Sequence, residues 1–527
     1  MKHISLRWWL LWLTAWLLLV VTSQYLLPLI PIDETRYISV AWEMWLHHDF
    51  LVPRLNGETY AHKPPLLFWL INLGWWVFGI NEWWPRLVPG LFALGSLWLT
   101  QRSAYLLWPQ RARVAFWAPT ILLGSLYWAL FTSRLMFDML MVFFTLLALL
   151  GVIQAGRGRY WGWGLFAAGI GLGLLTKGPV IFLYTLPPAL LAPLWINQPV
   201  VGWWRWYSGL LAGVAGGAVL ALCWVLPAIS HGGAGYENEL LWKQTTGRMV
   251  ESFSHDRPFW WYLPVLPIIL FPWLLWGGLW KAIAGLYRGG LDRYSRMCLY
   301  WMLLVLAIFS LIAGKQPHYL LPLFPAFALF AARCLDEQWQ ASARLHMFAP
   351  ALLLFSCGVF LLVIAYLAPS QNWPAWIENI SPLTGLGLML LGGFLLLPPR
   401  WSEPDTAVIA LGATSVAALL LVFAGVLHLA APVYDLKTLS RFVAQKQAAG
   451  AVIVNNANYH GQYHFLGRLQ KPLQEVRDNK VRQWAQQNPD GWIIFYPDSP
   501  HPPDDSPVYW QPYRTGSVVV RSASQVH

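Results

Sequence analysis

Long apolar segments separated by short polar ones make up the first 430 or so residues of the chain. The first apolar segment runs from about residue 8 to residue 30, behind Lys2 and Arg7. It lacks a small-residue cleavage site, so we expect an uncleaved first span. Further segments of spanning length cover residues 85–108, 114–133, 135–155, 160–176, 179–197, 206–229, 259–280, 297–313, 318–333, 346–368, 382–398 and 406–430. This pattern predicts an all-α polytopic membrane protein with about 13 spans.

Residues 64–80 are also apolar, but they are only just long enough to cross a bilayer. If they lie in the membrane interface, the loops that carry most basic residues fall on the same side as Lys2 and Arg7. These basic residues are Arg111, Arg113, Arg157, Arg159, Arg205, Lys281, Arg288, Arg293, Arg296, Arg333, Arg344 and Arg400. The positive-inside rule favours this arrangement. We therefore predict a cytoplasmic N-terminus, interfacial helices in a first outer loop at residues 31–84, and a C-terminus outside.

The hydropathy pattern changes at about residue 433. Short β-rich runs at residues 451–454, 492–496 and 518–520 follow a helical pattern near residues 436–449. We therefore expect a transmembrane domain over residues 1–432 and a small soluble α/β domain over residues 433–527.

The composition excludes an ordinary soluble enzyme. The chain is 57% hydrophobic and 11% charged, whereas soluble domains carry about 25% charged residues. The formal net charge of +11 is accounted for by cytoplasmic basic loops and anionic membrane lipid, so no nucleic-acid partner is expected.

The remaining ionisable and polar groups near the predicted spans gather on the outer side. They are Asp33, Glu34, Arg36, His62, Lys63, Arg134, Asp138, Lys177, Arg248, His255, Asp256, Arg257, Lys315, His318 and Tyr319. An ionisable group near the bilayer centre costs about 3 kcal/mol or more, so such clusters are candidate functional sites.

Several of these residues allow two interpretations. Asp33 sits where a helix N-cap is expected, so it is either a capping residue paired with Arg36 or a general base at the membrane surface. Lys63, followed by two prolines, either extends its amine to the interface or binds a phosphate. Lys177 and Lys315 depart from the positive-inside pattern, which suggests an anionic ligand.

Five short motifs resemble those of bacterial GT-C glycosyltransferases of the protein-mannosyltransferase type, which include the aminoarabinose transferases that modify lipid A. The motifs are Asp33-Glu34 after the first span, Tyr60-Ala-His-Lys-Pro-Pro, Thr176-Lys-Gly-Pro, Pro258-Phe-Trp-Trp-Tyr, and Gly314-Lys-Gln-Pro-His-Tyr. The resemblance covers the chain from the first span to about residue 333, and the motifs occur there in the same order as in the family. It implies an inverting enzyme of the bacterial inner membrane, with a periplasmic C-terminal domain. Such an enzyme takes a sugar from a polyprenyl (undecaprenyl) phosphate carrier and passes it to lipid A or another cell-envelope glycolipid.

The resemblance also implies roles for individual residues. Asp33, with Glu34 beside it, matches the catalytic carboxylate position. Lys63, Arg248 and Tyr319 match groups that hold the carrier phosphate, and Arg36 and Tyr60 match cavity-lining positions. His255 matches a position associated with a metal ion, and His62 stands where aminoarabinose transferases typically have glutamate. These two histidines are candidate ligands for Zn²⁺ or Mn²⁺.

Two other functions stay open from the sequence. A protein O-mannosyltransferase would share the donor but pass the sugar to protein. A non-enzymatic transporter of anionic lipid would also present basic residues at the outer face, although such a protein usually shows paired halves.

Overall fold

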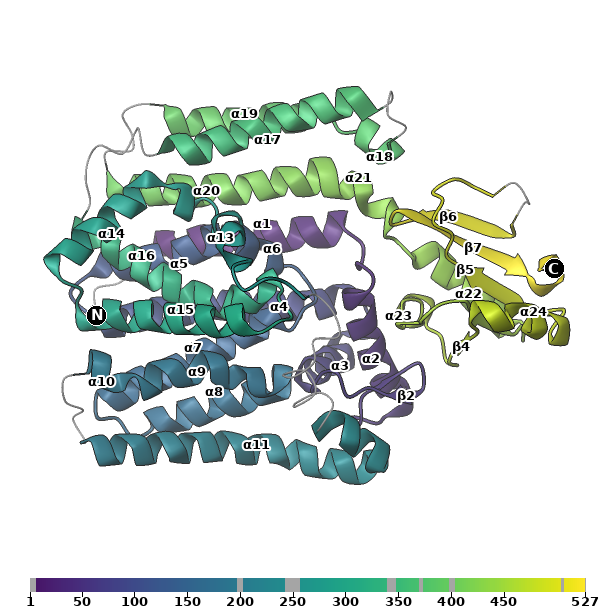
Figure 1. Ribbon diagram of the computed structural model, residues 1–527, viewed down its shortest axis with the longest axis horizontal. Helices are drawn as coiled ribbons and strands as arrows, with labels where there is room; N and C mark the ends of the chain where they lie inside the picture. Colours follow the sequence, from purple (N-terminus) through teal and green to yellow (C-terminus); the bar gives the residue numbers. More distant parts are fainter. Residues whose placement is uncertain are drawn as a thin grey trace. The chain divides into compact units, whose positions relative to one another are not determined.

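The computed structural model describes residues 6–196, 202–241, 256–338, 347–368, 373–397, 403–503 and 507–526. The described chain is mostly helical (Figure 1). It divides into two compact units. The first unit comprises residues 1–25, 62–67 and 86–426. The second comprises residues 26–61, 68–85 and 427–527. Most of the predicted first outer loop therefore groups with the C-terminal region.

The first unit is built from helices, many of them long and apolar. They are α1 (Leu6–Leu26), α4 (Trp83–Leu107), α5 (Ala112–Gly124), α6 (Leu126–Phe131), α7 (Asp138–Gly156), α8 (Gly162–Lys177), α9 (Ile181–Leu190), α10 (Ala192–Trp195), α11 (Trp203–Asn238), α13 (Tyr262–Ile269), α14 (Gly277–Gly289), α15 (Arg293–Leu311), α16 (Phe324–Gln338), α17 (Phe348–Leu367), α18 (Ala375–Glu378), α19 (Pro382–Leu396) and α20 (Pro404–Val422). In the described residues, eight helices are long and apolar enough to cross a membrane.

Some predicted spans are interrupted. The predicted span at 114–133 is divided at Ser125 into α5 and α6, where Leu126 N–H donates to the carbonyl oxygen of Phe271 at 2.9 Å. The predicted span at 259–280 contains the short α13, a 3₁₀ turn at Trp273–Leu275 and the start of α14. A count of 13 spans therefore stays a prediction.

Glycines allow α8 and α11 to pack closely. A Cβ atom on Gly209, Gly213 or Gly217 would lie within 2.8 Å of Trp163, Phe166 or Ile170 respectively. Small residues permit close helix approach in membranes. These three glycines therefore act in helix packing.

Loops predicted to be cytoplasmic meet at one end of the first unit. Arg333 pairs with Asp292 at 3.0 Å and with Glu337 at 2.9 Å. Arg111 pairs with Asp336 at 3.1 Å and with Glu337 at 2.6 Å. These contacts join the loop after α4, the start of α15 and the end of α16, which the charge pattern assigns to the same side.

The second unit contains a five-stranded sheet. Its strands are β3 (Ile453–Asn455), β4 (Gln474–Glu475), β5 (Trp492–Phe495), β6 (Tyr509–Tyr513) and β7 (Gly516–Ser522), in the order β4-β3-β5-β7-β6. β3 is parallel to β4 and β5, and β7 is antiparallel to β5 and β6. The helices are α22 (Lys437–Ala448), α23 (His464–Gly467) and α24 (Asp478–Gln487). The strands and the helix expected from the hydropathy pattern are present.

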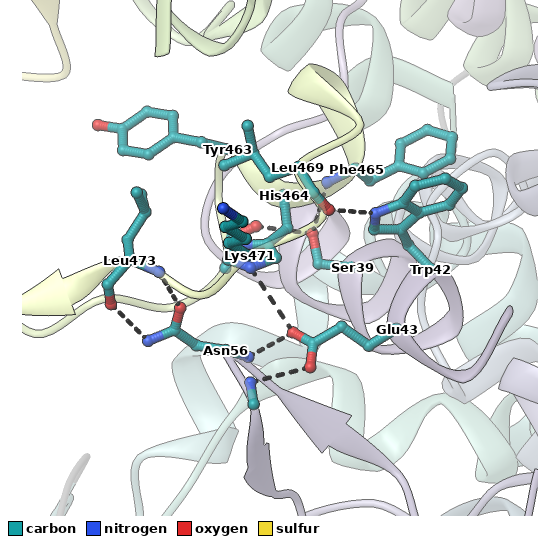
Figure 2. Close-up of polar contacts among 12 residues, drawn as sticks. Ser39, Trp42, Glu43, Asn56, Tyr463, His464, Phe465, Leu469, Lys471 and Leu473 are labelled. Carbon is teal, nitrogen blue, oxygen red and sulfur yellow. Dashed lines mark hydrogen bonds and ion pairs between the residues drawn. The ribbon is translucent and has the colours of Figure 1, made fainter. Parts of the chain in front are cut away.

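The same unit includes much of the predicted outer loop. This part contains α2 (Asp33–His47), the hairpin of β1 (Arg54–Leu55) and β2 (Glu58–Thr59), and α3 (Leu66–Phe78), most of which lies in this unit. α2 packs on α23 and the segment after it (Figure 2). Trp42 Nε1 donates to the carbonyl oxygen of Leu469 at 2.9 Å, and Asn56 exchanges two hydrogen bonds with Leu473, both at 2.8 Å.

Glu43 is buried at the centre of this contact. Its Oε2 atom accepts from Gly57 N–H at 3.0 Å, its Oε1 atom accepts from Asn56 N–H, and Oε1 lies 3.9 Å from His464 Nε2 (Figure 2). A buried carboxylate requires such partners. The hydrogen bonds around Glu43, Asn56 and Trp42 therefore hold the outer-loop helix and the C-terminal sheet region together as one unit.

Candidate functional site

In the first unit, an ion pair joins two predicted outer-side residues. Asp138 is the first residue of α7 and Lys177 is the last residue of α8. The Nζ atom of Lys177 lies 2.7 Å from Oδ1 of Asp138, and the side chains are 15% and 3% exposed. Lys177 also lies over the ring of Tyr319, 5.3 Å from its centroid. The charge of Lys177 is therefore met by a carboxylate of the protein, so this lysine does not by itself require an anionic ligand.

Two further predicted groups surround the same carboxylate. Lys63 and His318 both lie within electrostatic range of Asp138. Lys63 Nζ is 5.8 Å from the ring centroid of Phe137, and His318 stacks on Phe131 at 6.0 Å. Among the residues that the structure describes, Oδ2 of Asp138 has no hydrogen-bond partner. We call Lys63, Asp138, Lys177, His318 and Tyr319 the Asp138 cluster.

Lys315 is satisfied by the backbone. Its Nζ atom donates to the carbonyl oxygens of Arg257 at 2.8 Å and Ile312 at 2.6 Å, and the residue is 3% exposed. The geometry gives Lys315 a structural role, in which it joins the segment before α13 to the end of α15. The anionic ligand inferred from its position in the sequence is not needed to explain it.

Tyr319 is held by its main chain. Its carbonyl oxygen accepts from the Tyr184 hydroxyl at 2.8 Å, and the neighbouring Gln316 carbonyl accepts from the Tyr262 hydroxyl at 3.1 Å. These bonds fix the 3₁₀ segment Pro317–Leu323, which carries His318 and Tyr319. The motif of Gly314–Tyr319 and the aromatic motif ending at Tyr262 therefore meet in the structure.

In the second unit, Asp33 and Arg36 form an ion pair one helical turn apart. The Asp33 side chain is 51% exposed, and the Tyr37 hydroxyl lies 3.4 Å from its Oδ1 atom. The expected capping role of Asp33 is wrong, because Ile32 is the N-cap residue and Asp33 is the first helical residue. Glu34 instead accepts a hydrogen bond from Ile30 N–H at 2.8 Å and is buried. Glu34 therefore stabilises the helix start, whereas Asp33 faces solvent.

Tyr60 belongs to the same unit. It is 5% exposed, its ring is 6.4 Å from that of Phe68, and it lies within electrostatic range of Arg36. The structure thus brings Asp33, Arg36 and Tyr60 into one neighbourhood within the second unit.

The predicted metal and carrier residues are only partly described. Arg248 and His255 lie outside the described residues. His62 is exposed, and the described part of the chain contains no group of three or more His, Cys, Asp or Glu side chains that could hold a metal ion.

Two features were missed from the sequence. Asp138 was grouped with the outer polar residues but given no role, because its partner Lys177 lies 39 residues away and no local spacing links them. The second is His460 of the C-terminal region, which lies within electrostatic range of Arg36 and Asp33. No motif marks it.

The known proteins that are similar to this chain agree with the family that its sequence motifs resemble. Residues 62–231 match the family described as dolichyl-phosphate-mannose-protein mannosyltransferase. An undecaprenyl phosphate-α-4-amino-4-deoxy-L-arabinose arabinosyl transferase of Pseudomonas paraeruginosa is 32% identical over 376 residues, which span 68% of this chain and 66% of the relative. A protein of the same name from Pseudomonas fluorescens is 28% identical over 425 residues, spanning 75% and 72% respectively.

Solved structures show the same fold. The crystal structure of ArnT from Cupriavidus metallidurans in the apo state covers the whole chain with a TM-score of 0.78 and 20% identity. The structure of that protein bound to undecaprenyl phosphate gives 0.76 and 20%.

The fold and these relatives define the class of the protein, a multi-pass membrane glycosyltransferase with the GT-C fold. Within that class, the chain belongs to the protein-mannosyltransferase and lipid A aminoarabinose transferase type, as its motifs predicted.

Proposed function

We propose that this protein transfers a sugar from a polyprenyl-phosphate carrier to a glycolipid of the lipid A kind at the extracytoplasmic face of the inner membrane. The observation that carries this proposal is the similarity, over about three quarters of the chain, to relatives named for transfer from undecaprenyl phosphate. The fold neighbour bound to undecaprenyl phosphate supports a lipid-phosphate donor.

The chemistry is a single displacement with inversion at the anomeric carbon. The bond from that carbon to the carrier phosphate oxygen breaks, and a bond to an acceptor oxygen forms. Negative charge develops on the leaving polyprenyl phosphate, and fixed cations stabilise such charge most effectively where water is scarce. We assign this role to Lys63 and Arg248, with Tyr319 as a further contact to the carrier.

Asp33 acts on the acceptor. Its partly exposed carboxylate is fixed by Arg36 and is thus presented at a defined position. If the acceptor is a hydroxyl, Asp33 takes its proton; if the acceptor is a phosphate, no base is needed and Asp33 orients it. Arg36 and Tyr60 then line the part of the site where the acceptor binds. Glu34 keeps the start of α2 in place.

The proposed topology follows the charge pattern. The N-terminus is cytoplasmic, there are about 13 spans over residues 1–432, and residues 433–527 form a periplasmic soluble domain. The meeting of Arg111, Asp292 and Arg333 at one end of the first unit supports this sidedness. A divalent metal held by His62 and His255 stays a prediction. It is tested by metal analysis of the purified protein and of His255→Ala, in which a bound metal should be lost.

The donor is tested with purified protein. We expect it to consume a polyprenyl-phosphate sugar and release polyprenyl phosphate only when an acceptor is present. Lys63→Ala should raise the KM for the carrier, while the exposed control Lys480→Ala should not. Transfer from a soluble nucleotide sugar alone, or movement of lipid across vesicles without cleavage of a glycosidic bond, would contradict the proposal.

The acceptor is tested in cells. The masses of lipid A and of surface glycoproteins are compared with and without the gene. Loss of a sugar from lipid A supports the glycolipid acceptor. Loss from protein would instead favour protein O-glycosylation, the activity named in the family that residues 62–231 match.

A further inference from the structure

A pocket lies at the end of the first unit where the loops predicted to be cytoplasmic meet. Its volume is about 380 Å³, and it is lined by Lys281, Gly285 and Arg288 of α14 and by Gln338, the last residue of α16. α14 packs on α16 (Figure 1). A Cβ atom on Gly285 would lie 2.7 Å from Gln338 Oε1. Gly285 therefore forms a wall of the pocket without a side chain that would fill it.

The two cations of this pocket differ from other basic residues at the same end of the unit. Arg111 and Arg333 pair with carboxylates of the protein. Within the part of the chain that the structure describes, no ion pair joins Lys281 or Arg288 to a carboxylate, and both residues are exposed. The sequence directly after α16, residues 339–346, contains no Asp or Glu. The positive charge of the pocket is therefore suited to an anion from outside the protein.

α14 also carries an exposed aromatic flank beside these cations. Trp280 is 53% exposed and Tyr287 is 74% exposed. Each precedes a cation of the pocket by one residue, so the aromatic pair and the cationic pair run along neighbouring lines of the helix, two turns apart within each pair. The opposite face of α14 is buried. Exposed Trp and Tyr next to Lys and Arg are typical of a helix at a membrane surface, where the rings meet the acyl chains and the cations meet the lipid phosphates.

We propose that this pocket binds the phosphate of an anionic phospholipid headgroup from the leaflet that the charge pattern predicts to be cytoplasmic. Lys281 and Arg288 lie about 10 Å apart along the helix axis, and their long side chains can converge on one phosphate placed over Gly285. The Gln338 amide supplies a further hydrogen-bond donor. The aromatic flank favours a lipid over a soluble phosphate, because it gives the acyl chains an apolar surface next to the pocket. The site is separate from the sugar transfer, so it does not depend on the proposed function.

The test uses the full-length protein in detergent and measures lipid binding by native mass spectrometry, with phosphatidylglycerol and phosphatidylcholine as probes. The double variant Lys281→Gln with Arg288→Gln should bind phosphatidylglycerol about 10- to 30-fold more weakly than the wild type, with unchanged binding of phosphatidylcholine. Arg159→Gln with Arg205→Gln is the matched control, because it removes two exposed basic residues that the charge pattern places on the same side. It should keep the wild-type affinity. Because Lys281 and Arg288 lose no carboxylate partner, their double variant should unfold at the wild-type temperature in lipid-free detergent.

Two further measurements distinguish a defined lipid site from general attraction between charges. Gly285→Leu keeps both cations but fills the pocket, so it should weaken phosphatidylglycerol binding about tenfold. An excess of inorganic phosphate should not displace the lipid from the wild type. Equal affinities of the Lys281/Arg288 double variant and its control would overturn the inference, even if Gly285→Leu failed to fold. Wild-type affinity in folded Gly285→Leu, or displacement of the lipid by inorganic phosphate, would also overturn it, because the lipid would then bind elsewhere or the pocket would take a soluble anion.

Discussion

The Nζ atom of Lys177 lies 2.7 Å from Oδ1 of Asp138, and this ion pair ties the end of α8 to the start of α7. Both side chains are largely buried. Lys177, predicted from the charge pattern to lie on the outer side, therefore acts first as the partner of an internal carboxylate. Breaking such a pair by removing one partner is costly, because the other charge stays buried and uncompensated.

The first prediction concerns the stability of this pair. Lys177→Met should lower the free energy of unfolding by about 3–5 kcal/mol, measured by denaturant unfolding in detergent. The double variant Lys177→Met with Asp138→Leu should recover much of the loss, because it removes both charges. Lys281→Met, at an exposed lysine of α14, is the control. Wild-type stability of Lys177→Met combined with a raised KM for the carrier would instead assign Lys177 to phosphate binding.

The second prediction concerns pH and the contact between α2 and α23. Burial lowers the pKa of His464 from 6.5 to about 4, so the folded state holds a neutral imidazole. The contribution of the neutral His464 to the free energy of unfolding is complete above pH 6.5. It is lost as the pH falls from about 6.5 to about 4, because the unfolded chain binds the proton more readily. The loss reaches at most about 3 kcal/mol. The pKa of the neighbouring Glu43 is raised by burial, which has the opposite sign and reduces the net effect.

Hydrogen exchange of residues 33–47 at pH 7.5 and 5 measures this effect. Protection should decrease at the lower pH in the wild type and change less in His464→Gln. Equal acid loss of protection in His464→Gln would show that another group is responsible.

The sequence predicted most of what depends on local patterns. The hydropathy of α1 and α7, the short β-rich runs at β5 and β7, and the lysine motif at Lys63 are all visible along the chain. Residues far apart in sequence were harder to connect. The Asp138–Lys177 pair, the backbone partners of Lys315 and the contact of Ser39 with Gly461 all depend on tertiary packing. Because these contacts cannot be read from the sequence, the positive charges of Lys177 and Lys315 suggested an anionic ligand. In the structure, the Asp138 carboxylate pairs with Lys177, and backbone carbonyl oxygens accept hydrogen bonds from Lys315.

The third prediction concerns topology. α3 has 13 residues, so it spans about 20 Å, which is shorter than the roughly 30 Å hydrocarbon core. Reporter fusions after Gly79 and after Arg113 should therefore report extracytoplasmic and cytoplasmic positions respectively. A cytoplasmic signal after Gly79 would mean that residues 64–80 cross the membrane, and the assignment of the basic loops would have to be reversed.

The last prediction concerns Asp33 itself. Its carboxylate is paired with Arg36 but is still about half exposed, so an acceptor can approach it. Asn has nearly the same size but cannot take a proton. If Asp33 is a general base, Asp33→Asn should lower kcat by about 10²- to 10⁴-fold, with little change in the KM for the carrier. The exposed carboxylate of Glu58, in the same loop, provides the control Glu58→Gln, which should keep wild-type transfer.

The acceptor determines how far Asp33→Asn reduces the rate. With a hydroxyl acceptor the full loss is expected, because the proton has no other carrier. With a phosphate acceptor, the attacking oxygen is already ionised and needs no base. The decrease in kcat should then be smaller, because only the orienting effect of Asp33 is removed. Steady-state rates with the two acceptor types therefore distinguish the base from the orienting group. Near wild-type rates with both acceptors, in a variant that unfolds at the wild-type temperature, would remove Asp33 from the reaction.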